Sequence, residues 1–179
     1  MSFTCHTIES APPAARATMS AIERQFGYLP AAASAMATSP QLLLGFVRAN
    51  SLFTDTTLTE IEREVLVMTI ATHNGCEVCI ALHTEQLTRA EAPAEVVESL
   101  RTGTPLVDAR LDAMRQFVLE VLATAGNVSD VALAQFLGAG YSPRNALDVV
   151  LGIGTYTMST LANRLTRAPL DPQLASYTL

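Results

Sequence analysis

Residues 64–83 read EVLVMTIATHNGCEVCIALH, and this stretch decides both the fold and the chemistry that we expect. Residues 73–75 (HNG) suit a helix C-terminus, so one helix should end there and a second should begin at or near Cys76 and run to about Leu87. In the first of these helices, side chains at three- and four-residue spacing share one face, which is typical of a packed helix: Leu58, Ile61, Val65, Met68 and Thr72.

Proline, glycine and capping residues divide the remaining chain into further helices, about eight in total. Ser-Pro at 39–40 and at 142–143 is typical of a helix start. Residues 57–60 (TLTE) are predicted to form a capping box, and Thr-Pro at 104–105 is predicted to cap another helix. The sequence shows no alternation of apolar and polar residues typical of strands, so the predicted fold class is all-α. The other predicted helices cover residues 12–26, 30–37, 41–52, 93–100, 104–126, 128–137 and 143–164.

The chain has 179 residues, enough for one domain with a well-filled core. We expect a single helical domain over residues 1–179, in which residues 1–11 form a flexible N-terminus. Residues 64–67 (EVLV) and 148–151 (DVVL) both place an acid before an apolar run, which suggests a degenerate internal helical repeat. At that offset Asn163 corresponds to Cys79, and Asn163 and Tyr156 are candidates to line a pocket from the second half.

Composition excludes several kinds of function. The formal charge is −6 and all 11 basic residues are arginine, so no lysine is present for a Schiff base, pyridoxal phosphate or a Walker-type phosphate loop. A basic stripe for nucleic acid is not visible. The uncharged stretch 149–163 is too short and too polar to span a membrane, and residues 1–11 do not resemble a secretory signal. We therefore expect a cytoplasmic protein that binds neither nucleic acid nor membranes, in which a close cysteine pair is catalytic or metal-binding.

Cys76, Cys79 and His83 share one stripe of the predicted second helix, because they lie three and four residues apart. This spacing allows the two sulfurs to form a disulfide, which needs Cα atoms roughly 4.4–6.8 Å apart. The first turn of a helix stabilises a thiolate, and His83 can take the proton of Cys79.

A buried acid beside His83 would fix the tautomer of its imidazole and stabilise the protonated ring. Glu64 is the candidate, since it lies at the edge of an apolar stripe. The pattern is equally consistent with a solvated helix residue among Glu60, Glu62 and Arg63. Glu77 places a negative charge near the sulfurs and would oppose thiolate formation.

Metal binding is the main alternative for a C-x-x-C pair, but a structural zinc site needs about four ligands and a second pair is missing. Three ligands on one helical stripe fit a tetrahedron poorly, so we expect neither a metal nor a cofactor. His73 is expected to interact with a helix C-terminus, and Cys5 and His6 are expected to be incidental.

Glutamate, eleven residues, and then C-x-x-C-x-x-x-H resembles the motif of the AhpD-like, carboxymuconolactone decarboxylase superfamily. The stretch GAGYSPRNALDVVLGIGTYTMSTLANRL at 138–165, followed by APLD at 168–171, is similar to its peroxidase-related, alkylhydroperoxidase-like members. The resemblance covers roughly residues 44–171. Some members have an aromatic residue or histidine where this chain has Val78, and the lactone decarboxylase branches lack the cysteine pair.

The resemblance implies an AhpD-like helical bundle that forms homo-oligomers, with trimers and hexamers common. It implies a dithiol peroxidase that reduces hydrogen peroxide or organic hydroperoxides. In such members Cys79 would become a sulfenic acid and then a disulfide with Cys76, with His83 as base and Glu64 as relay acid. An external dithiol or lipoyl-type donor would reduce the disulfide.

Two other functions stay open from the residues. The first is a thiol–disulfide oxidoreductase or redox sensor with little peroxidase activity. The second is a non-catalytic, metal-binding helical oligomer.

Overall fold

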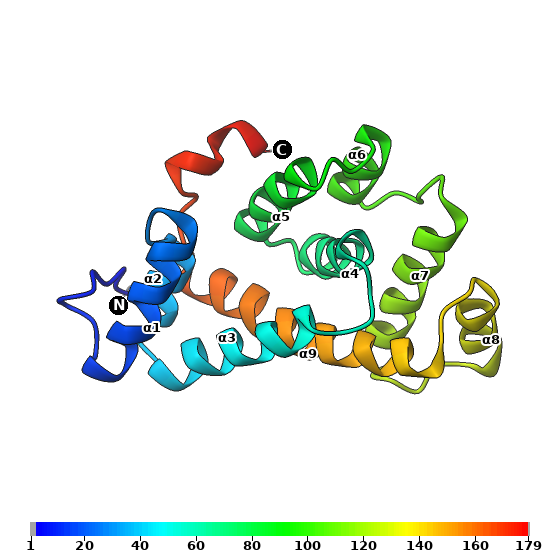
Figure 1. Cartoon of the computed structure of the whole chain (residues 1–179), viewed down its shortest axis with the longest axis horizontal. Helices are drawn as coiled ribbons and strands as arrows, with labels where there is room; N and C mark the ends of the chain where they lie inside the picture. Colours follow the sequence, from blue (N-terminus) through cyan, green and yellow to red (C-terminus); the bar gives the residue numbers. More distant parts are fainter. Residues whose placement is uncertain (1–2, 179) are drawn as a thin grey trace.

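Helix α4 lies at the centre of the protein, and the other helices are arranged around it (Figure 1). The computed structural model describes residues 3–178, and over that part the chain forms nine α-helices, one 3₁₀ helix and no strand. The predicted all-α class is confirmed. The helices are α1 (Pro13–Phe26), α2 (Ala31–Met36), α3 (Pro40–Thr54), α4 (Glu60–His73), α5 (Glu77–Arg89), α6 (Ala94–Thr102), α7 (Ala109–Thr124), α8 (Asp130–Gly138) and α9 (Pro143–Thr166), followed by η1 (Pro172–Tyr177).

Helix α4 is central because its middle is covered on all sides. Every residue from Val65 to Ala71 is buried, and α5, α6, α7 and α9 pack around it. A helix that is hydrophobic on all sides is stable in water only when neighbours cover every face. The main core therefore surrounds α4, and a second, smaller cluster joins α1 and α2 to α3 and the far end of α9.

Two of the predicted helix starts are wrong. The capping box at the start of α4 is formed by Thr59 and Glu62, two residues later than the predicted box at residues 57–60. The side chain of Thr59 accepts from the N–H of Glu62, whose carboxylate accepts from the N–H of Thr59. Helix α7 begins after Asp108, not after residues 104–105, because the Asp108 carboxylate accepts two backbone N–H groups.

Glu62 is buried, although the sequence placed it among surface charges. Burial by itself raises the pKa of Glu62, but the N–H of Thr59 and the guanidinium of Arg110 outweigh it and hold the pKa below its ordinary value. In the ion pair with Arg110, the distance from Nη2 of Arg110 to Oε1 of Glu62 is 2.8 Å. Glu62 therefore anchors the start of α4 to α7.

The chain ends lie on the outside of the bundle. Residues 1–11 were expected to be flexible; in the described part, the backbone carbonyl of His6 accepts from Ser34 Oγ at 2.6 Å and Ala11 is buried. At the other end the guanidinium of Arg101, on α6, donates to the carbonyls of Tyr177 and Thr178, and η1 packs against α5. Among residues 3–178, no helix is long and apolar enough to cross a membrane.

Close packing of α9 against α3 and α4 depends on Gly152. A Cβ atom at this position would lie 2.6 Å from Cε2 of Phe53 and 2.8 Å from Cδ2 of Leu66, well inside van der Waals contact. Gly154, two residues further on, has open space at the same position.

We therefore expect Gly152→Ala to lower the free energy of unfolding by about 1–3 kcal/mol, because the new methyl group forces α9 away from its neighbours. Gly154→Ala is the matched control and should be neutral or slightly stabilising, since alanine favours a helix. Urea denaturation of both variants measures the difference. Equal stabilities for the two variants would contradict the close packing at Gly152.

Candidate active site

A tight turn between α4 and α5 positions the cysteine pair. Gly75 has a φ of 61°, a left-handed conformation that ends α4, and the N–H of Cys76 returns to the carbonyl of Ala71 at 2.9 Å. Cys76 is the N-cap of α5 and Cys79 lies in its first turn. The two residues form a disulfide, with Cα atoms 5.3 Å apart. The disulfide predicted from their spacing is therefore present.

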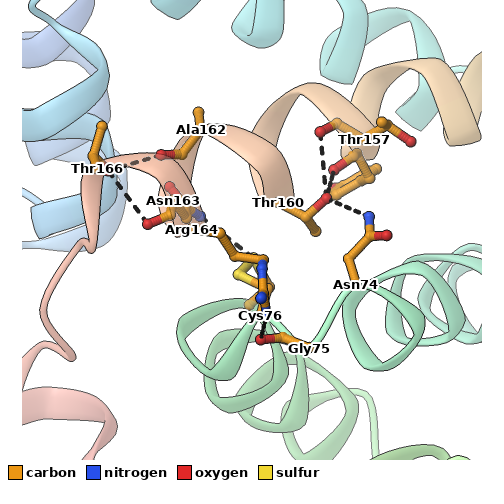
Figure 2. The surroundings of a disulfide bond; sticks show 11 residues. Asn74, Gly75, Cys76, Thr157, Thr160, Ala162, Asn163, Arg164 and Thr166 are labelled. Atoms are coloured by element: carbon orange, nitrogen blue, oxygen red, sulfur yellow. Dashed lines mark hydrogen bonds between the residues drawn. A yellow bond between two sulfur atoms is a disulfide. The ribbon is translucent and has the colours of Figure 1, made fainter.

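One face of α9 holds this turn in place (Figure 2). The amide of Asn74 donates to Thr160 Oγ1 at 2.8 Å, and the guanidinium of Arg164 donates to the carbonyl of Gly75. Between them, the amide Nδ2 of Asn163 donates to the sulfur of Cys79 at 3.3 Å. Residues 160, 163 and 164 lie three and four positions apart, so all three contacts come from one side of the helix.

The left-handed backbone conformation at Gly75 favours glycine. A Cβ atom there would also lie 2.7 Å from the guanidinium of Arg164, so a larger residue would displace the flexible end of this arginine from the turn.

His83 and Glu64 lie together inside the bundle. Nδ1 of His83, on α5, is 2.8 Å from Oε2 of Glu64, on α4, and the exposed fractions of the two side chains are 10% and 15%. An ionised carboxylate only accepts hydrogen bonds, so Nδ1 carries the proton and Nε2 is left to accept one. Glu64 is thus not a solvated surface residue, and the arrangement suits a base oriented by an acid.

Aromatic side chains enclose the imidazole. The ring of Tyr156, on α9, meets His83 edge to face with centroids 5.3 Å apart, and Phe46 and Phe53 of α3 pack on Tyr156 in turn. The Tyr156 hydroxyl donates to Asn50 Oδ1 at 2.8 Å. Burial, reinforced by the nearby charge of Glu64, raises the pKa of Tyr156 well above its usual value, so the phenol stays neutral.

The cysteines and the histidine are almost entirely buried. Exposed fractions are 2% for Cys76, 4% for Cys79 and 8% for His83. A cavity of about 580 Å³ opens beside Cys76, and its lining includes Asn163 but neither Cys79 nor His83. Of the two cysteines, Cys76 alone therefore borders this cavity.

Asn163 is the residue that sequence reasoning placed only loosely, as a candidate pocket residue. Its correspondence to Cys79 in the suggested internal repeat was the available signal. That signal did not predict contact, because the two residues are 84 positions apart and meet only through helix packing.

Three other residues singled out from the sequence are exposed. His73 is exposed in the last turn of α4, and Cys5 is exposed near the N-terminus. Glu77 is exposed at the first position of α5. Among residues 3–178, no group of three or more His, Cys, Asp or Glu side chains could hold a metal ion.

Comparisons with known proteins agree with this arrangement. The carboxymuconolactone decarboxylase family matches residues 40–123, which include both cysteines, His83 and Glu64. No curated protein matches the chain in sequence.

Solved structures are similar over nearly the whole chain. One is a peroxidase-related protein from Ralstonia eutropha JMP134 with an alkylhydroperoxidase AhpD core, at a TM-score of 0.84 and 18% identity, covering 96% of this chain and 93% of that one. A peroxidase-related protein from Silicibacter sp. TM1040 gives 0.79 and 18%, covering 99% and 92%. The debrominase Bmp8 gives 0.78 and 14%, covering 98% and 95%. The AhpD-like fold expected from the sequence is confirmed, and it is shared by proteins named as peroxidase-related and by one named as a debrominase.

The contact between Asn163 and Cys79 gives a testable expectation for the reduced protein. An N–H group that donates to sulfur favours the thiolate over the thiol. In a Cys76→Ser background, Asn163→Ala should raise the midpoint pH for alkylation of Cys79 by roughly one unit, the size of one ordinary hydrogen bond.

Thr160→Val is the matched control, since it alters the same face of α9 without touching sulfur. Alkylation rates across a pH series, read by mass spectrometry, measure both variants. A midpoint that does not move in Asn163→Ala would mean that the amide does not stabilise the thiolate.

Proposed function

Since this chain has the AhpD-like fold and its residues 40–123 belong to the carboxymuconolactone decarboxylase family, we propose that it is a dithiol peroxidase. The observation that carries the proposal is the buried disulfide of Cys76 and Cys79, with the His83–Glu64 pair one helical turn beyond Cys79. The substrates proposed are hydrogen peroxide or small organic hydroperoxides.

In the first step, Nε2 of His83 takes the proton of the Cys79 thiol, and the resulting thiolate attacks the terminal oxygen of the hydroperoxide. The O–O bond breaks, the alcohol oxygen leaves with its electron pair, and the imidazolium of His83 returns the proton to it. Cys79 is then a sulfenic acid. The sequence-based roles of His83 as base and Glu64 as relay acid fit the hydrogen bond between them, because Nε2 remains available to exchange protons.

In the second step, Cys76 attacks the sulfur of Cys79, water is released and the disulfide forms. The Cα separation of 5.3 Å allows this bond without moving the backbone. An external dithiol or lipoyl-type donor then returns the pair to thiols. Such a cycle needs a reducing compartment, and we propose the cytoplasm.

A thiol–disulfide oxidoreductase is the second candidate. The cavity beside Cys76 favours this second function, since a disulfide that borders a cavity can exchange with external thiols without any peroxide. Similarity to the debrominase Bmp8 shows that the fold alone does not set the reaction.

We also propose that the protein works as a homo-oligomer. Helix α9 carries an exposed apolar stripe formed by Leu147, Val150, Leu161 and Leu165, with exposed fractions between 53% and 72%. Large apolar side chains gathered on one helix face often mark an interface.

Peroxide consumption with a dithiol reductant separates these functions. Cys79→Ser should abolish turnover, since the attacking sulfur is gone. Cys76→Ser should consume about one equivalent of peroxide and then stop at a sulfenic acid or mixed disulfide. Mass spectrometry identifies the stalled species.

If both cysteine variants consume peroxide as the unmodified protein does, the peroxidase proposal fails. If the unmodified protein exchanges its disulfide with thiols but consumes no peroxide, the oxidoreductase function replaces it.

The role of Glu64 is tested by Glu64→Gln. The amide keeps the shape but not the charge that orients and stabilises the imidazolium, so peroxide turnover should fall about 10- to 100-fold, less than the full contribution of an acid–base group. Glu60→Gln, an exposed acid one turn earlier on α4, is the control. Equal turnover in the two variants would remove Glu64 from the mechanism.

The oligomer is tested by light scattering. The purified chain should have a mass several times its 19.1 kDa, and Leu161→Glu should shift it toward the monomer, because a charge cannot be buried unpaired at an apolar contact. A monomeric mass for the unmodified protein would contradict the proposal.

A further inference from the structure

The cavity beside Cys76, here called the Cys76 cavity, is lined by three segments of the chain. Its volume is about 580 Å³. The start of α5 forms one side, the last turns of α9 form another, and the segment after α9 closes it together with Thr178. The residues at its margin come from segments that Arg164 and Arg101 hold together through backbone carbonyls.

Only one of the two sulfur-bearing residues belongs to this lining. Cys76 lines the cavity, whereas Cys79 does not, and the amide of Asn163 covers the Cys79 sulfur. Which sulfur of a disulfide is attacked depends on access. A thiolate entering here therefore meets Cys76 and expels Cys79.

The charges around the cavity favour an anion. Arg164 and Arg167 line it, and Glu77 is the one acid among the lining residues of the described part, 3–178. Neither arginine has an ion-pair partner among residues 3–178, although five other ion pairs occur in that part of the chain. The first residues of α5 also line the cavity, and they bring the partial positive charge of a helix N-terminus.

We propose that the Cys76 cavity binds the reducing co-substrate, and that this co-substrate is a small dithiol that carries a carboxylate or another anionic group. The inference rests on the proposed function and names the class of its electron donor. Arg164 and Arg167 attract the anionic group, and the cavity directs the sulfur to Cys76.

The reaction balances as two thiol–disulfide exchanges. The first thiolate of the donor attacks Cys76, which breaks the Cys76–Cys79 bond and releases Cys79 as a thiolate hydrogen-bonded to Asn163. The second thiolate of the donor then attacks the first sulfur of the donor in the mixed disulfide, which forms the donor's disulfide and releases Cys76 as a thiolate. The donor is oxidised to a disulfide by two electrons, and both enzyme cysteines are reduced.

Dihydrolipoate and dihydrolipoamide form a matched pair of donors. They share the same dithiol and chain and differ only in the charge of a remote terminal group, so their intrinsic reactivity is nearly equal. Each donor is mixed with the oxidised protein without peroxide, and the reduced cysteines are alkylated and counted by mass spectrometry. The readout is therefore independent of peroxidase activity.

We expect dihydrolipoate to reduce the unmodified protein roughly 3- to 10-fold faster than dihydrolipoamide at low salt, the range that two exposed charge pairs provide. The ratio should fall toward one in Arg167→Gln and in high salt. Glu77→Gln should raise it. Arg144→Gln, which removes an exposed arginine from the opposite end of α9, should leave it unchanged.

A ratio near one in the unmodified protein, or a ratio that Arg167→Gln leaves intact, would overturn the proposal. The two donors are compared within each variant. A variant whose disulfide is reduced more slowly by both donors therefore keeps the same ratio of rates. Loss of peroxide consumption with an intact ratio would instead contradict the peroxidase proposal alone.

Discussion

The hydrogen bonds from α9 to the turn between α4 and α5 are the constraint on which the candidate site depends. Asn74, Gly75 and Cys79 each contact a side chain from one face of α9. The turn cannot shift without breaking several of these contacts at once. A helix some 85 residues away in the chain thereby sets where the sulfurs lie, and the long, closely packed α9 links the redox turn to the rest of the bundle.

Burial of α4 explains the other half of the site. Because neighbours cover most of this helix, a polar side chain on one of the covered faces needs a partner inside the protein. Glu64 finds His83 on α5, and Glu62 finds Thr59 and Arg110. Two acids, two residues apart on one helix, thus have separate roles: one anchors the helix start, and the other holds an imidazole.

Local patterns predicted most of the helices and the stripe of Cys76, Cys79 and His83, because these depend on spacing along one chain segment. The hydrogen bond of Glu64 was only one of two open interpretations, since it requires the crossing of α4 and α5. The contact of Asn163 with Cys79 and the Cys76 cavity could not be predicted, because they arise where distant segments meet. The capping errors at 57–60 and 104–105 have a simpler cause: several residues nearby could cap, and packing selects among them.

The position of the disulfide within one helical turn has a consequence for how the protein carries its redox state. The Cα atoms of Cys76 and Cys79 have a separation that residues three apart near a helix start adopt with or without a bond between their sulfurs. Oxidation therefore needs no backbone rearrangement. A partner that recognises only the backbone shape would bind the oxidised and reduced proteins equally well. A molecule must therefore react with the sulfurs to distinguish the two redox states.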